Sequence, residues 1–467
     1  RPSDQREAIE TFVLGLVAEP PAEEFVYRPD PQELAIVEGR RVLEKYNCGG
    51  CHILEGEKWE LESEPGEIPY QVADSAVPPS FAEARFSTTA LAASAATDAR
   101  RGVIKTVVTG APAIDNDGYL LVLDEDGAPT DIEDEDDPSV LQYQFQLWEP
   151  VAFEGSTANI GGKLTVPISR VTNKWPARGG DLTRWLLPRV VELEKEDNPQ
   201  ANGNEAWGWL PPPLLGEGQK VQPEWLHSFL LEPYPIRPAV FLRMPKFNMS
   251  PDEATKLVRY FAAHDGEEYP FEYDDRMMTK HVETEQEAFA EAHGGDKTRL
   301  DHAMQIVTDG NYCIKCHLVG EFVPESNQRA LAPDLSDIQA RLRPDYVRKW
   351  VAYPKHILPY TPMPINIPYD PDSETLGGVA QELYPGTSIE QLDGLVDLLM
   401  NYSNHVGGKY DFEALVKQAA AAAAPAEASP EPAAPAADEV DEDEDEDEDE
   451  GKEEPAEDQT ADEKSEA

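Results

Sequence analysis

All four cysteines of this 467-residue chain lie in two copies of one short motif. The copies are Cys48-Gly-Gly-Cys51-His52 and Cys313-Ile-Lys-Cys316-His317. The spacing C-x-x-C-H is the attachment signature of c-type haem. Two thiols one helical turn apart can add to the two vinyl groups of a porphyrin, and the following imidazole then lies under the iron. The sequence therefore predicts two covalent haem c groups, held by Cys48, Cys51, Cys313 and Cys316, with His52 and His317 as iron ligands.

Other uses of paired cysteines fit this pattern less well. A disulfide or a thioredoxin-like pair does not require a histidine in the next position. A structural zinc site would bring two C-x-x-C pairs together at close spacing, whereas these two lie 265 residues apart. Covalent haem attachment in bacteria takes place outside the cytoplasm. We therefore expect an extracytoplasmic protein, in the bacterial periplasm or on the outer face of the inner membrane.

An internal repeat downstream of the two motifs points to a second iron ligand. In each copy three prolines are spaced 11 and then 10 residues apart, and a Met-Pro pair follows. The copies are Pro212, Pro223, Pro233 and Met244-Pro245, and Pro333, Pro344, Pro354 and Met363-Pro364. Each copy predicts a helix that begins at the second proline, carries a buried aromatic residue six positions later and ends at the third proline.

A methionine thioether is a soft, neutral ligand that suits the sixth position of a low-spin haem iron. The register of the repeat favours Met244 and Met363 in this role. Met249 could replace Met244, and His227 or His356 could instead give irons with two histidine ligands. We expect the other methionines to be packing residues, namely Met277, Met278, Met304 and Met400.

At this point the chain resembles the class I c-type cytochromes. Residues 39–46 look like the N-terminal helix of that family, and residues 250–261 and 388–402 look like the C-terminal helix that crosses it. The resemblance implies that the carbonyls of Pro212 and Pro333 orient the two histidines. The fused architecture is also similar to that of cytochrome subunits of bacterial respiratory assemblies.

The first copy departs from that family by a long insertion. His317 and Pro333 are 16 residues apart, but His52 and Pro212 are 160 apart, so about 144 residues are inserted. Strand-like stretches occur in it at 102–109, 118–123, 140–148 and 163–168. The alternation of Leu141, Tyr143, Phe145 and Leu147 suits a strand with one buried face. We expect a small antiparallel β subdomain, closed by a helix near residues 181–195, that serves in docking or in shielding a haem edge.

The predicted fold class is mainly α, with two class I cytochrome c domains, the first interrupted by a β-rich insertion, and a disordered acidic tail. The expected boundaries are an N-terminal helix in 1–36, which could end a preceding domain; domain 1 in 37–264 with the insertion at about 63–206; a linker in 265–296; domain 2 in 297–410; and the tail in 411–467. The Ala/Pro/Glu composition of the tail, followed by an Asp-Glu run, cannot bury a core.

The charge of the chain limits its partners. It holds 39 basic and 91 acidic residues, a net charge of −52, of which about −17 lies in 438–467. Such a field repels nucleic acid and anionic lipid and favours partners with basic docking surfaces. No run reaches the roughly 20 apolar residues of a membrane helix. We therefore expect membrane association only through a partner or a segment that precedes Arg1.

The sequence predicts an electron carrier rather than an enzyme. The expected partners are redox proteins or subunits of a respiratory complex. The alternative is a dihaem peroxidase, which needs one haem with an open sixth position and an acid or base above it. Both haems here have a Met-Pro candidate, which argues against that alternative. The acidic loop at 124–137 has oxygen ligands for calcium but lacks the pattern of an EF-hand loop, so a solvated loop is expected.

Overall fold

The computed structural model describes residues 2–406 and residue 414, except for residues 16–25, 27, 67–70, 74–87, 113–119, 131–137, 150, 155, 159–162, 200–207, 268–273, 326–330, 359–360 and 368–377. The predicted acidic tail except residue 414, residues 131–137 of the acidic loop and residues 268–273 of the predicted linker therefore lie outside the described residues. About 49% of the structure is helical and about 15% is strand. No helix among the described residues has the length and apolar character needed to cross a membrane.

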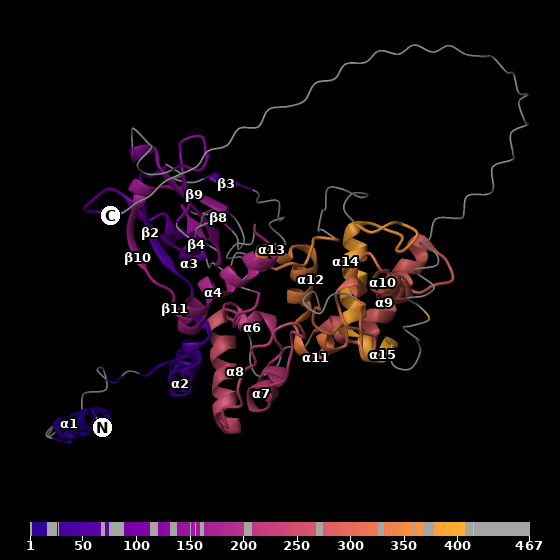
Figure 1. Cartoon of the computed structure of the whole chain (residues 1–467), viewed down its shortest axis with the longest axis horizontal. Coiled ribbons are helices and arrows are strands. Elements are labelled where there is room, and N and C mark those ends of the chain that lie inside the picture. Colours follow the sequence, from indigo (N-terminus) through magenta and orange to yellow (C-terminus); the bar gives the residue numbers. More distant parts are fainter. Residues whose placement is uncertain are drawn as a thin grey trace, which may run out of the picture. The chain divides into compact units, whose positions relative to one another are not determined.

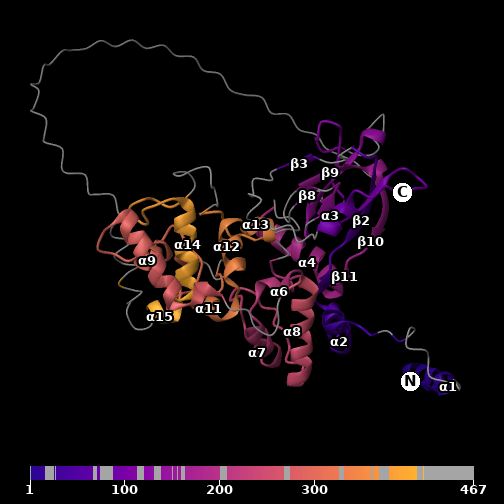
Figure 2. The ribbon, with the colours of Figure 1, turned by 180° about the vertical axis from the view of Figure 1, so that it is seen from behind.

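The first group of helices belongs to the part of the chain that carries the first C-x-x-C-H motif (Figure 1, Figure 2). Its helices are α2 (Pro31–Lys45), α4 (Asp181–Asp197), α6 (Glu217–Lys220), α7 (Pro223–Leu231) and α8 (Pro251–Asp265). Helix α1 (Pro2–Gly15) precedes them in the chain. Helix α8 begins with a capping box between Ser250 and Glu253, which satisfies backbone N–H groups at the helix start.

Helices α2 and α8 cross at very short range because a glycine lies at their contact. A Cβ atom on Gly39 would lie 2.2 Å from Cβ of Tyr260 and 2.9 Å from the carbonyl oxygen of Lys256. No larger residue fits there without moving a helix. Hydrogen bonds from Lys45 and Tyr46, at the end of α2, to Glu253, in the first turn of α8, also stabilise this contact. The helices expected at 39–46 and 250–261 are thus present and packed together.

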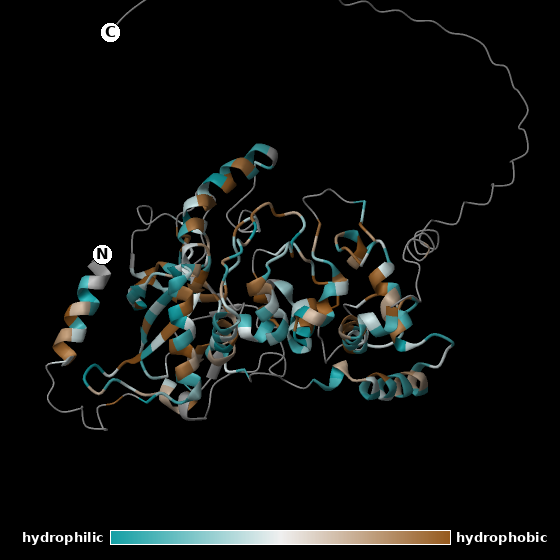
Figure 3. Cartoon of the chain, turned by 90° about the horizontal axis from the view of Figure 1, so that it is seen from below, coloured by the Kyte–Doolittle hydropathy of each residue, from teal (hydrophilic) through white to brown (hydrophobic). Residues whose placement is uncertain are grey.

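The second group of helices belongs to the part of the chain that carries the second motif. It contains α9 (Thr279–His293), α10 (Arg299–Thr308), α11 (Ile338–Arg341), α12 (Pro344–Ala352), α13 (Pro354–Ile357), α14 (Ser388–Met400) and α15 (Tyr402–Val406). Apolar and polar residues alternate along the helices of the chain (Figure 3). Short 3-10 turns are η2 (Cys48–Gly50), η3 (Pro138–Val140), η4 (Ile168–Arg170), η5 (Asp275–Met277), η6 (Cys313–Lys315) and η8 (Leu335–Asp337).

The described part of the predicted linker is bound to this second group. Asp397 on α14 has no exposed side-chain surface and accepts hydrogen bonds from Arg276 at 2.9 Å, Arg299 at 2.5 Å and His281 at 3.1 Å. A buried carboxylate needs such partners to offset the loss of water. Two of these partners, Arg276 and His281, belong to the interval 265–296, so this interval contributes to the packing of α14.

The helices expected from the proline repeat are present. Helix α7 begins at Pro223 and α12 at Pro344, each with proline in its first turn, and each ends before the next proline. The prediction of a buried aromatic residue in each is wrong, because Phe229 and Trp350 are only half-buried. Each instead stacks on an aromatic residue one turn earlier, Phe229 on Trp225 and Trp350 on Tyr346.

The insertion forms an antiparallel β subdomain, as expected (Figure 1). The described residues show a seven-stranded sheet in the order β10-β2-β4-β6-β9-β3, with β5 paired to β6. Its strands are β2 (Lys58–Ser63), β3 (Gln71–Ala73), β4 (Ile104–Pro112), β5 (Val122–Leu123), β6 (Gln142–Leu147), β9 (Lys163–Pro167) and β10 (Val171–Trp175). Smaller pairs join β1 (Ile53–Glu55) to β11 (Arg178–Gly179) and β7 (Val151–Phe153) to β8 (Ser156–Ala158).

One face of this sheet carries its own core. Trp59, Leu61, Val108, Phe145, Leu147, Leu164 and Val166 are buried together. Leu141, directly before β6, and Phe145 and Leu147 on it are buried, whereas Tyr143 is half-buried like Gln142 and Gln144. The expected alternation is therefore confirmed for three of its four residues. Helix α3 (Thr88–Ser94) also lies in the insertion. Helix α4 follows β11 over the range expected for the closing helix.

Candidate functional site

The two C-x-x-C-H motifs adopt the same backbone turn. In the first, the N–H groups of Cys51 and His52 both donate to the carbonyl of Cys48, at 3.2 and 2.9 Å. In the second, Cys316 and His317 donate to the carbonyl of Cys313 at the same two distances. One tight turn therefore places two thiols and one imidazole together in each motif.

The thiols of both motifs are free and half-buried. Burial raises the pKa of Cys48 to about 11 and that of Cys313 to about 12, because a thiolate loses solvation there. Both thiols are therefore neutral at pH 7 in this state.

Each motif histidine is held by a proline carbonyl. Nδ1 of His52 lies 2.7 Å from the carbonyl oxygen of Pro212, and Nδ1 of His317 lies 2.7 Å from that of Pro333. A carbonyl can only accept, so Nδ1 must carry the proton and donate it. Burial also lowers the pKa of both histidines, which keeps the imidazoles neutral. The predicted hydrogen bond between proline and histidine is confirmed in both copies.

This arrangement leaves the other ring nitrogen available. Among the described residues, no group forms a hydrogen bond with Nε2 of His52 or His317. A neutral imidazole with its Nδ1 proton fixed by a carbonyl carries its lone pair on Nε2, and this is a common arrangement of a metal-ligating histidine. In the described part of the chain no three His, Cys, Asp or Glu side chains gather in one metal site. A haem iron does not need such a cluster, because the porphyrin supplies four nitrogens.

The insertion returns the chain to the same register as the uninterrupted copy. The N–H of Leu214 donates to the carbonyl of Ile53 at 2.9 Å, and the N–H of Leu335 donates to that of Leu318 at 2.9 Å. Each donor lies two residues after the proline that bonds the motif histidine, and each acceptor is the residue directly after that histidine. About 144 inserted residues therefore leave the local geometry of the first site unchanged.

The end of the insertion packs directly on the first motif. The N–H of Gly180 donates to the carbonyl of Gly49 at 2.7 Å, and the Thr183 hydroxyl donates to that of Cys51 at 3.1 Å. Gly179 has φ of +83°, and a Cβ there would lie 2.4 Å from the carbonyl oxygen of His52. Only glycine allows this approach. The insertion thus covers one side of the first motif, through contacts of Gly179, Gly180 and Thr183 that the sequence did not indicate.

The candidate methionines lie on the same hydrophobic core as the motif cysteines. Met244 and Met363 are half-buried and pack against that core, as do Cys48 and Cys313. Met249 is buried within it. His227 is hydrogen-bonded through Nε2 to the carbonyl of Pro251 at 3.1 Å, which occupies that nitrogen. The side chain of His356 lies outside the described residues. Of the methionines expected to pack, Met304 and Met400 are buried, and Met277 is partly buried against the core.

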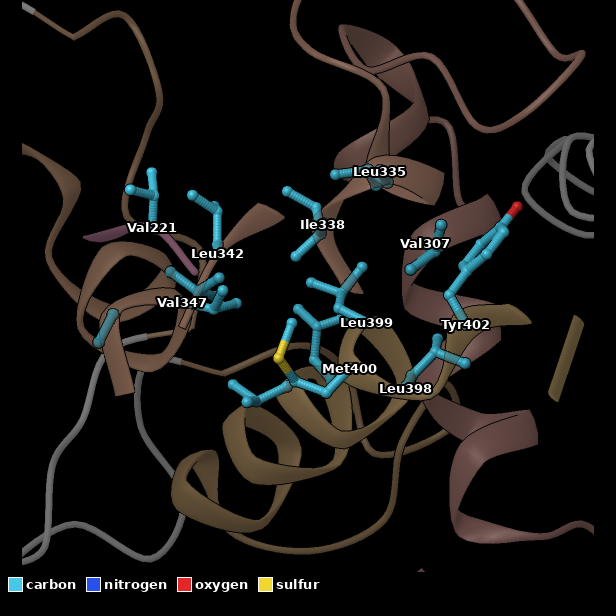
Figure 4. Close-up of a cluster of buried hydrophobic side chains, with 14 of the residues drawn as sticks. Val221, Val307, Leu335, Ile338, Leu342, Val347, Leu398, Leu399, Met400 and Tyr402 are labelled. Carbon is cyan, nitrogen blue, oxygen red and sulfur yellow. The ribbon is translucent and has the colours of Figure 1, made fainter. Parts of the chain in front are cut away.

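The two repeat copies meet at a symmetric junction. The N–H of Gln222 donates to the carbonyl of Arg341 at 2.9 Å, and the N–H of Arg343 donates to that of Lys220 at 3.0 Å. Gln222 and Arg343 each precede the helix-starting proline, so equivalent residues exchange equivalent bonds. Val221 and Leu342 pair between them, and Figure 4 shows these two side chains beside Val347. The junction joins both copies into one buried core.

A buried guanidinium at this junction was missed by the sequence reasoning. Arg341 is almost fully buried, its Nε has no hydrogen-bond partner, and burial lowers its pKa. An incompletely satisfied buried cation is costly and calls for an acceptor. Burial depends on tertiary packing, so nothing in the sequence distinguished Arg341 from a surface arginine.

Comparisons with family models, with curated proteins and with solved structures give no match for this chain.

Proposed function

We propose that the chain is a dihaem c-type cytochrome that transfers electrons. The observation that carries the proposal is the duplicated arrangement of a buried, neutral histidine. Its Nδ1 is fixed by a proline carbonyl, its Nε2 has no partner among the described residues, and two free thiols lie in the same turn. This donor set fits haem c.

Four cysteines would hold the porphyrins through thioether bonds, Cys48 and Cys51 at one site and Cys313 and Cys316 at the other. His52 and His317 would be one axial ligand of each iron, and Met244 and Met363 the other. When bound, each haem supplies an iron that can be oxidised and reduced by one electron. The unsatisfied Nε of Arg341 offers a donor for a carboxylate, and haem carries two propionate groups.

The protein's own groups would keep these sites closed. The Pro212 and Pro333 carbonyls fix the orientation and the protonation of the histidines. The half-buried thioethers of Met244 and Met363 are neutral, so they add no charge to a buried site. A closed site favours electron transfer over substrate binding, which supports a carrier rather than a peroxidase.

The proposed location is extracytoplasmic, because the proposed haem attachment takes place there. The proposed partners are redox proteins or subunits of a respiratory complex. The net charge of −52 favours partners with basic docking surfaces.

The experiment is a haem count on the full chain expressed with a bacterial cytochrome c maturation system. Pyridine haemochrome absorbance against protein mass is expected to give two haems per chain. Cys51→Ser and Cys316→Ser are each expected to lower the count to one. His227→Gln is the matched control, because His227 already bonds a backbone carbonyl, and it is expected to keep both haems. A full-length chain with fewer than two covalent haems would refute the proposal.

A further inference from the structure

The loop that leads from α7 to Met244 is fixed at both ends. The guanidinium of Arg237 donates through Nη1 to the carbonyl of Gly208 at 2.8 Å and through Nη2 to that of Leu210 at 2.9 Å. Val240 and Met249 are buried. The conformation of the loop between these points is therefore set by packing and hydrogen bonds.

Despite these anchors, the centre of the loop presents apolar side chains to solvent. Phe241 is 94% exposed and its neighbour Leu242 is 44% exposed. Leaving a large apolar side chain in water forgoes the stabilisation that burial would give. Aromatic residues in such positions are typical of the centres of protein interfaces.

The charge of this loop is opposite to that of the chain. Residues 236–247 contain three basic and no acidic residues, whereas the whole chain holds 39 basic and 91 acidic residues. Two of the three cations are engaged, Arg237 by the two carbonyls and Lys246 by Glu232. Arg243 bonds only the carbonyl of Leu242, at 3.2 Å, and no carboxylate among the described residues pairs with it.

The equivalent loop of the second copy lacks this combination. Residues 357–367, around Met363, contain no charged residue. Among the described residues of that loop, the exposed large apolar side chain is Ile365, next to the proline that follows Met363. A partner that needs both an apolar contact and a cation is therefore matched by the first copy.

We propose that Phe241, Leu242 and Arg243, here called the Phe241 patch, are the docking surface for a redox protein. The partner has an apolar face around its own cofactor and a carboxylate at the rim of that face, which pairs with Arg243. The proposal rests on the proposed function, since it gives the haem beside Met244 the role of exchanging electrons with that partner.

The overall charge of the partner and the charge of its docking face follow from interactions at two distances. Beyond the Debye length of about 8–10 Å, only the screened field of the acidic chain remains, and it repels an acidic body. At contact, one unpaired guanidinium and two apolar side chains determine the fit. The partner is therefore not acidic overall, although its docking face carries at least one carboxylate.

The test is electron transfer from the reduced, haem-loaded chain to a blue-copper protein with an apolar docking face and a rim carboxylate, followed by stopped flow. Phe241→Ala is expected to lower the second-order rate constant about tenfold, the size of an interface hot spot. Arg243→Gln is expected to lower it about threefold at low salt and to have little effect at high salt. Trp185→Ala is the matched control, because Trp185 on α4 is also strongly exposed, at 73%, and this variant is expected to match the wild type.

Oxidation by tris(1,10-phenanthroline)cobalt(III), a small oxidant of high potential that needs no docking face, separates the possible outcomes. The proposal is supported if Phe241→Ala slows only the reaction with the copper protein. It is overturned if Phe241→Ala reacts with the copper protein like the wild type, or if the reaction with the cobalt complex slows equally, since Phe241 would then act through the haem site. A chain that carries no haem and reacts with neither oxidant would instead refute the proposed function.

Discussion

In both C-x-x-C-H motifs, one hydrogen bond fixes the orientation and the protonation of the histidine. The 2.7 Å bonds from Nδ1 to Pro212 and Pro333 decide which nitrogen remains for a ligand. The sequence identified the two histidines from the local spacing C-x-x-C-H and the two prolines from their repeat, and the resemblance to class I c-type cytochromes implied that the proline carbonyls orient the histidines. Arg341 could not be found in that way, because its importance comes from burial between two segments that are distant in the sequence.

The choice between Met244 and Met249 is a prediction at the residue scale. Met249 is buried in the core, whereas Met244 is half-buried at its edge, where a thioether can face a ligand. In the haem-loaded ferric chain, Met244→Ala and Met363→Ala are each expected to remove part of the far-red thioether-to-iron absorption band. Met249→Ala is expected to keep the band and to lower stability by about 2–5 kcal/mol through the cavity it leaves.

Loss of the band in Met249→Ala but not in Met244→Ala would show that the repeat register does not identify the ligand. Absorbance spectra and urea unfolding of the same three samples distinguish the two results.

A second residue-scale prediction concerns acid. Hydrogen bonds from Lys45, Tyr46 and Ser250 lower the pKa of Glu253 from 4.5 to about 2. A carboxyl group with a depressed folded-state pKa stabilises the fold above its unfolded pKa, and this contribution is lost as pH falls from about 4.5 to about 2. Thermal unfolding of Glu253→Gln is expected to show a shallower loss of stability across that range than the wild type. Parallel curves for the two proteins would contradict this assignment.

At the scale of elements, the sequence predicted what repeats or alternates. The helix starts at Pro223 and Pro344 follow from proline in the first turn, and strand β6 follows from the alternation of Leu141, Phe145 and Leu147. The short pair β1 and β11 was missed because two or three residues give no periodic signal. Its position depends on Gly179 and Gly180, whose left-handed backbone brings the end of the insertion against the first motif.

The symmetric junction is also beyond sequence patterns, since it pairs residues 121 positions apart, but it gives a clear prediction. The Gln222 side chain donates to the carbonyls of Gln339 and Leu342, at 2.8 and 2.7 Å. Gln222→Ala would remove both of these bonds from the junction, and the expected loss of stability is about 2–3 kcal/mol in urea unfolding. Gln32→Ala is the control, because Gln32 makes one exposed bond to the carbonyl of Ala263. Equal stability of the two variants would mean that the junction contributes little.

At the scale of the whole molecule, charge is unevenly distributed. About −17 of the net charge of −52 lies in residues 438–467, outside the described residues. The Phe241 patch, in contrast, carries one positive charge, that of Arg243. The composition of the tail predicts a solvated chain that needs no fixed position to act. Its effect on a partner is then long-ranged and is screened by salt within about 8–10 Å.

Removal of residues 411–467 tests this role of the tail. The truncated chain is expected to keep both haems, because every predicted ligand precedes residue 411. With a basic redox protein at low ionic strength, the full chain is expected to react about tenfold faster than the truncated chain, and the difference is expected to vanish at high salt. The control is Phe241→Ala in the full chain, which removes apolar contact and therefore lowers the rate at every salt concentration. If the full and truncated chains have the same salt dependence, the tail does not steer the encounter, and the charge of about −32 on residues 1–410 alone attracts the partner.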